Sequence, residues 1–124
     1  MVWLSRDLVM AIHDEQLAEH DGAGGSRDNG LLEGALARPT NREGYTNPDI
    51  AELAALYALR IVRNHSFIDG NRGTAYVALE TFLALNRLRF PVSDADAAIV
   101  TLQMAAGDID DDTVIGWART NVSA

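Results

Sequence analysis

A short polar stretch in the middle of the chain carries the residue types best suited to chemistry. Residues 63–75 have the sequence RNHSFIDGNRGTA, which gathers a histidine, a carboxylate, a Gly-Asn pair and two arginines. Helical apolar patterns precede and follow this stretch. Residues of these types at this spacing can bind an anion and move a proton beside it.

The Gly-Asn pair predicts how an anion would be held. Gly70 takes positive φ without steric cost, and Asn71 tolerates that conformation better than most residues. Such a turn directs successive backbone N–H groups at one point, and the apolar pattern from Thr74 onward predicts a helix that begins there. Partial positive charge at a helix N-terminus favours phosphate, and Arg72 adds a permanent cation with several donors.

The other side chains of the stretch supply a base, a metal ligand and an anchor. His65 titrates near neutral pH, so it can accept a proton from an attacking hydroxyl group. Asp69 offers hard carboxylate oxygens for Mg²⁺ that already carries phosphates and water. Phe67 is expected to anchor the stretch in the core. Together these parts predict chemistry on nucleotide phosphates.

Arg63 has two open explanations. It is expected near the C-terminus of a core helix, where a cation offsets the helix dipole. Alternatively, because it lies two residues before His65, its guanidinium faces the site and binds phosphate. His13 and His20 have no companion residue at a useful spacing, so we expect structural roles for both.

Residues 65–71, His-Ser-Phe-Ile-Asp-Gly-Asn, resemble the H-x-F-x-[D/E]-[G/A]-N motif of the Fic/Doc superfamily. The continuation N-[K/R]-x-T-A, followed by an apolar helix, resembles the Doc branch. Residues 24–39, GGSRDNGLLEGALARP, resemble the segment that precedes the core helices in Doc-like proteins. The resemblance covers most of the chain, and a motif of this length is far more specific than a lone glycine pattern.

This resemblance implies an all-α, single-domain Fic/Doc-type bundle that uses ATP and Mg²⁺. Doc-like toxins transfer the γ-phosphoryl group of ATP to a threonine of elongation factor Tu and so block translation. His65 would accept the proton of the target hydroxyl group, and Asp69 would hold Mg²⁺. The phosphates would bind to Gly70, Asn71 and Arg72. The resemblance also implies a Phd-type antitoxin whose tail folds on the toxin.

Gly73 departs from the family pattern, which usually has an arginine that contacts nucleotide phosphates. Losing a charge-assisted contact of that kind costs roughly 1.5–3 kcal/mol. Glycine inside a helix costs a further ~1 kcal/mol relative to alanine. Two alternatives to phosphoryl transfer stay open. The protein transfers AMP to a protein hydroxyl group, as many Fic relatives do, or it is a weakened or inactive Doc homologue that mainly binds an antitoxin.

Length and composition favour one small helical domain, residues 1–124. The chain has 48% hydrophobic residues, rich in Ala and Leu, which is enough for a compact core. A net charge of −8 argues against nucleic acid and anionic lipid as partners and favours a basic protein segment. The chain has no cysteine, no basic leader segment and no apolar run of the ~20 residues that a membrane span needs. We therefore expect a cytoplasmic protein.

Apolar spacing and capping residues predict about six helices. The first starts after Ser5 and ends near His20, and a short second helix is stopped by Pro39. A third helix is expected from its N-cap Asn47 to Asn64, a fourth from Thr74 to Asn86, and a fifth from its N-cap Ser93 to Gly107. The acidic residues Asp110–Asp112 are expected to open the last helix.

Three expectations concern individual segments. Residues 88–92 are expected to form an extended connector, packed as a loop or as a minor strand. Thr74 is expected to cap its helix or to bond within it. The acidic run Asp110–Asp112 is expected to cap the last helix and otherwise to face solvent.

Overall fold

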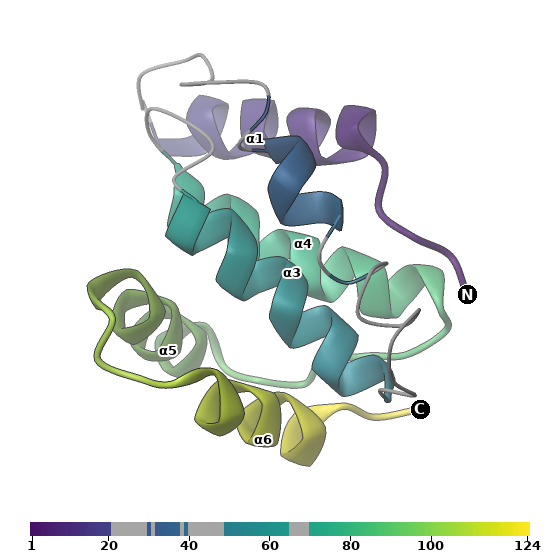
Figure 1. The fold of residues 1–124 in the computed structure, drawn as a ribbon, viewed down its shortest axis with the longest axis vertical. Coiled ribbons are helices and arrows are strands. Elements are labelled where there is room, and N and C mark those ends of the chain that lie inside the picture. The colour runs from purple at the N-terminus through teal and green to yellow at the C-terminus, as the bar shows by residue number, and fades with distance from the viewer. Residues whose placement is uncertain (21–29, 31, 38, 40–48, 65–69) are drawn as a thin grey trace.

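The structure is a computed structural model that describes residues 1–20, 30, 32–37, 39, 49–64 and 70–124 (Figure 1). Its helices are α1 (Arg6–His20), α3 (Ile50–Asn64), α4 (Asn71–Leu85), α5 (Asp94–Ala106) and α6 (Asp111–Asn121). Residues 30, 32–37 and 39 are also helical. Within the described ranges, the β-structure is one isolated bridge between Arg89 and Ser123. The predicted all-α class is confirmed, and residues 88–92 form a connector with a single bridging residue.

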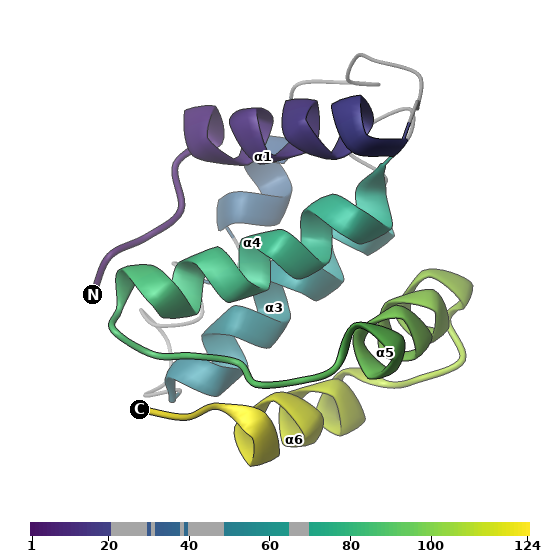
Figure 2. The same ribbon diagram turned by 180° about the vertical axis from the view of Figure 1, so that it is seen from behind.

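Helix α3 is the core of the bundle. It contacts α4, α5 and α6, while α1 packs on α4 (Figures 1 and 2). Every side chain from Leu53 to Leu59 is buried, and so are Ile61 and Val62. A helix that is apolar on nearly all sides belongs in the interior, because each face must be covered. The end of α3 is therefore a firmly packed starting point for the chain that follows it.

An aromatic cluster joins the N-terminal segment to α3 and α4. The ring centroids of Tyr57 and Phe82 lie 4.9 Å apart, and Trp3 stacks on Phe82 at 6.0 Å. The Tyr57 hydroxyl accepts a hydrogen bond from the backbone N–H of Leu4 at 3.2 Å. These contacts hold the segment before α1 against the core. No helix among the described residues has both the length and the apolarity that crossing a membrane requires.

Several helix ends follow the predictions, because local capping chemistry decides them. The hydroxyl of Ser5 accepts the N–H of Leu8 at 3.1 Å, and that of Ser93 accepts the N–H of Asp96 at 3.2 Å. Gly107, in the left-handed conformation with φ 75°, ends α5 as expected. The predicted boundaries at His20, Asn64 and Asn86 are also confirmed.

Two predicted helix starts were wrong. Helix α3 begins at Ile50 rather than at Pro48, because the Asp49 carboxylate accepts the N–H of Glu52 at 2.8 Å and so caps the helix. Helix α4 begins at Asn71, before the predicted start at Thr74. The N–H of Thr74 already bonds to the carbonyl of Gly70 at 3.0 Å, as expected for a residue inside the helix.

The side chain of Thr74 also differs from expectation. It is completely buried, and its hydroxyl has no hydrogen-bond partner among the described residues, so it neither caps α4 nor bonds to the preceding turn. Thr101 of α5 behaves differently, since its hydroxyl bonds to the carbonyl of Ala97 at 2.9 Å and the residue can therefore be buried. Because Thr101 faces the interior, Ile99 and Leu102 of α5 point outward and are 56% and 54% exposed.

Candidate active site

Three of the predicted site residues lie outside the described residues. His65, Phe67 and Asp69 belong to the 65–69 segment, so their proposed roles stay predictions. The residues on both sides are described. Helix α3 ends at Asn64, and α4 begins immediately after Gly70. The motif therefore joins the end of the central helix to the start of its main neighbour.

The turn at Gly70 has the geometry that an anion cradle requires. Its φ of 79° and ψ of 13° are left-handed, which confirms the predicted conformation. The N-cap residue of α4 is Gly70, which has no side chain that could cap the helix. The N–H groups of a first helical turn have no partner inside the helix, and with the dipole they favour an anion. The side chain of Arg72 in this turn is exposed, so its positive charge is accessible.

Helix α1 packs directly against the Gly70 turn. A β-carbon on Gly70 would lie 3.5 Å from Cδ2 of His13 and 3.5 Å from Cδ2 of Leu17. His13 is 1% exposed, so its ring is part of the wall behind the turn. This fits the structural role expected for His13, although its contact with the motif was not foreseen. The available signal was its helical spacing with Leu17, which places both residues on one face of α1.

Gln16, on the same side of α1, covers Gly73 in the first turn of α4. A β-carbon on Gly73 would lie 3.2 Å from Cδ and 3.6 Å from Cγ of Gln16, and would overlap its Oε1 atom. The Gln16 amide thus occupies the space that an arginine side chain at position 73 would enter. No hydrogen bond from Gln16 to another described residue is seen. Its side chain is consequently able to move away at low cost.

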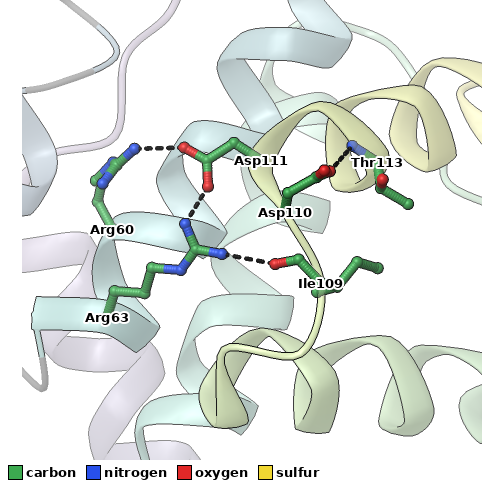
Figure 3. A network of polar contacts seen from close by, with 6 residues as sticks. All are labelled: Arg60, Arg63, Ile109, Asp110, Asp111 and Thr113. Carbon is green, nitrogen blue, oxygen red and sulfur yellow. Dashed lines mark hydrogen bonds and ion pairs between the residues drawn. The ribbon is translucent and has the colours of Figure 1, made fainter.

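Arg63 is engaged by the start of α6. Its guanidinium forms an ion pair with Asp111 and donates to the carbonyl of Ile109 at 2.9 Å (Figure 3). Arg60 approaches the other carboxylate oxygen of Asp111 at 2.7 Å. The position of Arg63 in the last turn of α3 is as predicted, whereas phosphate binding by Arg63 stays a prediction. Such binding would compete with these contacts.

The acidic run at the start of α6 is only partly as expected. Asp110 caps the helix by accepting the N–H of Thr113 at 2.7 Å. The Thr113 side chain, and in second place this backbone N–H, lowers the pKa of the Asp110 carboxyl group through hydrogen bonding. Asp111 was expected to face solvent, but it is the shared partner of Arg60 and Arg63. Within the described ranges, no three potential ligands gather into a metal site. Asp69, the predicted magnesium ligand, lies outside those ranges.

The motif, the left-handed glycine and the helical frame around them define the class of protein. The chain belongs to the Fic/DOC family, whose model matches residues 3–83, from the segment before α1 almost to the end of α4. Helices α5 and α6 lie beyond that match.

Within the family, the chain belongs to the Doc branch. It is 29% identical over 117 residues to "Protein kinase doc" of Escherichia phage P1. The aligned residues make up 94% of this chain and 92% of the phage protein. It is also 35% identical over 94 residues to "Toxin Doc" of Mycolicibacterium smegmatis, and the aligned region covers 71% of each chain. The resemblance of the motif to Doc proteins is thereby confirmed.

Proposed function

We propose that this protein is a Doc-type toxin that transfers the γ-phosphoryl group of ATP to a protein hydroxyl group. A threonine of elongation factor Tu is the proposed target, and blocked translation the result. The observation that carries the proposal is the motif itself, placed between the end of α3 and the left-handed Gly70 turn at the N-terminus of α4. The names of the two relatives, one a kinase and one a toxin, support it.

The described half of the site fits a phosphate group. The first turn of α4 follows a glycine N-cap, its backbone N–H groups favour an anion, and Arg72 adds an exposed positive charge. In the proposal, Gly70, Asn71 and Arg72 bind phosphate oxygens, and Asp69 holds Mg²⁺. Bound ATP with Mg²⁺ supplies a transferable phosphoryl group and a cation that offsets its charge.

His65 is the proposed general base. Its imidazole accepts the proton of the target hydroxyl group as that oxygen bonds to the γ-phosphorus. The bond from this phosphorus to the oxygen that bridges it to the β-phosphate breaks, and ADP leaves with that oxygen. The imidazole later gives the proton to solvent. The packed turn around Gly70 and His13 orients the residues that follow, since phosphoryl transfer depends mainly on positioning and electrostatics. The protein groups that bind the nucleotide phosphates then need to move little during the reaction.

The proposed partners follow from the same class. A Phd-type antitoxin would restrain the toxin by folding its tail on the surface of this chain. The net charge of −8 favours a basic segment on that partner. Action on elongation factor Tu would require the protein to work in the cytoplasm.

Mass spectrometry of elongation factor Tu after incubation with the protein, ATP and Mg²⁺ tests the proposal. We expect a gain of one phosphate on a threonine, and no gain with the His65→Ala variant. A gain of AMP would instead assign the protein to the Fic-type AMP transferases. No modification of the factor, combined with normal growth of cells that produce the protein, would contradict the toxin assignment.

A second candidate is a weakened Doc homologue that mainly binds an antitoxin. The observation in its favour is Gly73 in the first turn of α4. This residue has no cationic side chain, and the neutral amide of Gln16 covers it. Growth assays separate the two candidates. If the wild-type protein and its His65→Ala variant are equally harmless on induction, the binding role is supported and the enzyme proposal fails.

A further inference from the structure

Helices α3 and α6 lie antiparallel and are joined by ion pairs at both ends. Asp49, the N-cap of α3, pairs with Arg119 near the end of α6 at 2.6 Å. At the opposite end, Asp111 in the first turn of α6 pairs with the last two turns of α3. The two ends differ in their relation to the motif. Only the Asp111 end lies where α3 gives way to the residues that begin at His65.

The Asp111 contacts fix the arginine that precedes the motif in one orientation. One carboxylate oxygen accepts from Arg63, and the other accepts from Arg60 at 2.7 Å (Figure 3). The second guanidinium nitrogen of Arg63 donates to the carbonyl of Ile109 at 2.9 Å. Contacts through two nitrogens restrict a planar guanidinium far more than a single contact would.

The carboxylate itself is held in place by its own helix. Asp110 caps α6 through the N–H of Thr113 at 2.7 Å, which sets the first turn that carries Asp111. The side chains of Asp111, Arg60 and Arg63 are 34%, 21% and 29% exposed, compared with 48% and 54% for Asp49 and Arg119. The pairs at the motif end are thus better shielded from solvent, where ion pairs are weak.

We propose that Asp111 is a positioning residue for the catalytic motif. By holding Arg63, it fixes the last turn of α3 and hence the point and direction in which the chain enters His65. The inference rests on the proposed phosphotransferase function. It also gives α6 a part in the site, although α6 lies outside the residues that the family model matches.

The physical reason is that a helix end is the part of a helix that frays most easily. Without Asp111, Arg60 and Arg63 would be two like charges on successive turns with no carboxylate between them. The last turn of α3 would then lose its ion pair with α6 and gain a repulsion. A misplacement of about 1 Å at a catalytic group can cost as much as a hundredfold in rate.

The test compares Asp111→Asn with Arg119→Gln, which removes the ion pair at the remote end of the same two helices. Both variants are expected to lower the unfolding temperature by a few degrees. Only Asp111→Asn is expected to lower kcat for phosphoryl transfer, by about tenfold or more, with KM for ATP nearly unchanged. Asp111→Glu, which keeps the charge, is expected to recover part of kcat and serves as the second variant if Asp111→Asn unfolds.

An NMR titration of His65 provides a readout that does not depend on activity. Asp111→Asn should shift the imidazole resonances and their titration midpoint, and Arg119→Gln should leave both unchanged. If wild-type protein transfers no phosphate, the proposed function fails, but the NMR comparison still decides the positioning role. Equal effects of both variants on kcat and on His65 would overturn the inference. A lower KM for ATP in Asp111→Asn at constant kcat would also overturn it, since Asp111 would then only keep Arg63 from phosphate.

Discussion

Glu80 of α4 lies near Asp94, the first residue of α5, and the two carboxylates repel each other. Burial, and in second place this repulsion, raises the pKa of the Glu80 carboxyl group above 4.5. The neighbouring Tyr76 is affected in the same way: burial, then Glu80 and Asp94, raise the pKa of its hydroxyl to about 12. The junction of α4 and α5 therefore stores unfavourable negative charge at neutral pH.

Glu80→Gln is expected to stabilise the protein at pH 7. A carboxyl group whose pKa is raised on folding contributes stability below its unfolded pKa of about 4.5, and this contribution is lost as the pH rises through the folded pKa. Glutamine does not ionise, so the variant does not lose this stability at pH 7. Thermal unfolding should show a higher midpoint for the variant at pH 7 and little difference at pH 4. Glu15→Gln, at an exposed position on α1, is the control, and an equal effect there would contradict the prediction.

Tyr57→Phe is expected to destabilise the fold by about 1–3 kcal/mol, because the buried N–H of Leu4 would lose its acceptor. The ring and its contact with Phe82 at 4.9 Å would be kept, so lost packing would contribute little. Urea denaturation measures the free energy of unfolding, and hydrogen exchange measures protection of the Leu4 amide. Unchanged protection of that amide in the variant would show that the hydrogen bond does not hold the N-terminal segment.

Features decided by neighbouring residues were predictable from the sequence. Ser93, Gly107 and Asp110 cap or stop helices through contacts within a few residues, so their types and positions were sufficient. The left-handed turn at Gly70 was predictable for the same reason. The start of α3 was not, because Asn47 and Asp49 are both good caps and only the observed bond to Glu52 distinguishes Asp49.

Contacts between distant segments were not predictable from local patterns. Arg63 and Asp111 are 48 positions apart, and nothing in either local pattern indicates that they meet. The placement of Gln16 over Gly73 likewise depends on how α1 packs on α4. The sequence predicted the motif and the turn that carries it, whereas the residues that surround the turn became visible only in the fold.

The Gly73→Ala substitution is expected to show energetic coupling with Gln16. Alanine favours a helix by up to ~1 kcal/mol over glycine, but its β-carbon must displace the Gln16 amide. The gain in unfolding free energy should therefore be larger in a Gln16→Ala background than in the wild type. Urea denaturation of the two single variants and the double variant measures this difference. Strict additivity would show that the Gln16 side chain yields at no cost.

The Gly73→Arg substitution tests whether the cradle lacks one cation. We expect ATP with Mg²⁺ to bind about ten- to a hundredfold more tightly, since a charge-assisted hydrogen bond contributes roughly 1.5–3 kcal/mol. The gain should increase when Gln16→Ala is combined with it, because the new side chain then enters vacant space. Isothermal titration calorimetry measures both affinities, with Gly73→Ala as the control for helix stabilisation alone. Equal affinities for the arginine and alanine variants would mean that a cation at this position does not reach the nucleotide.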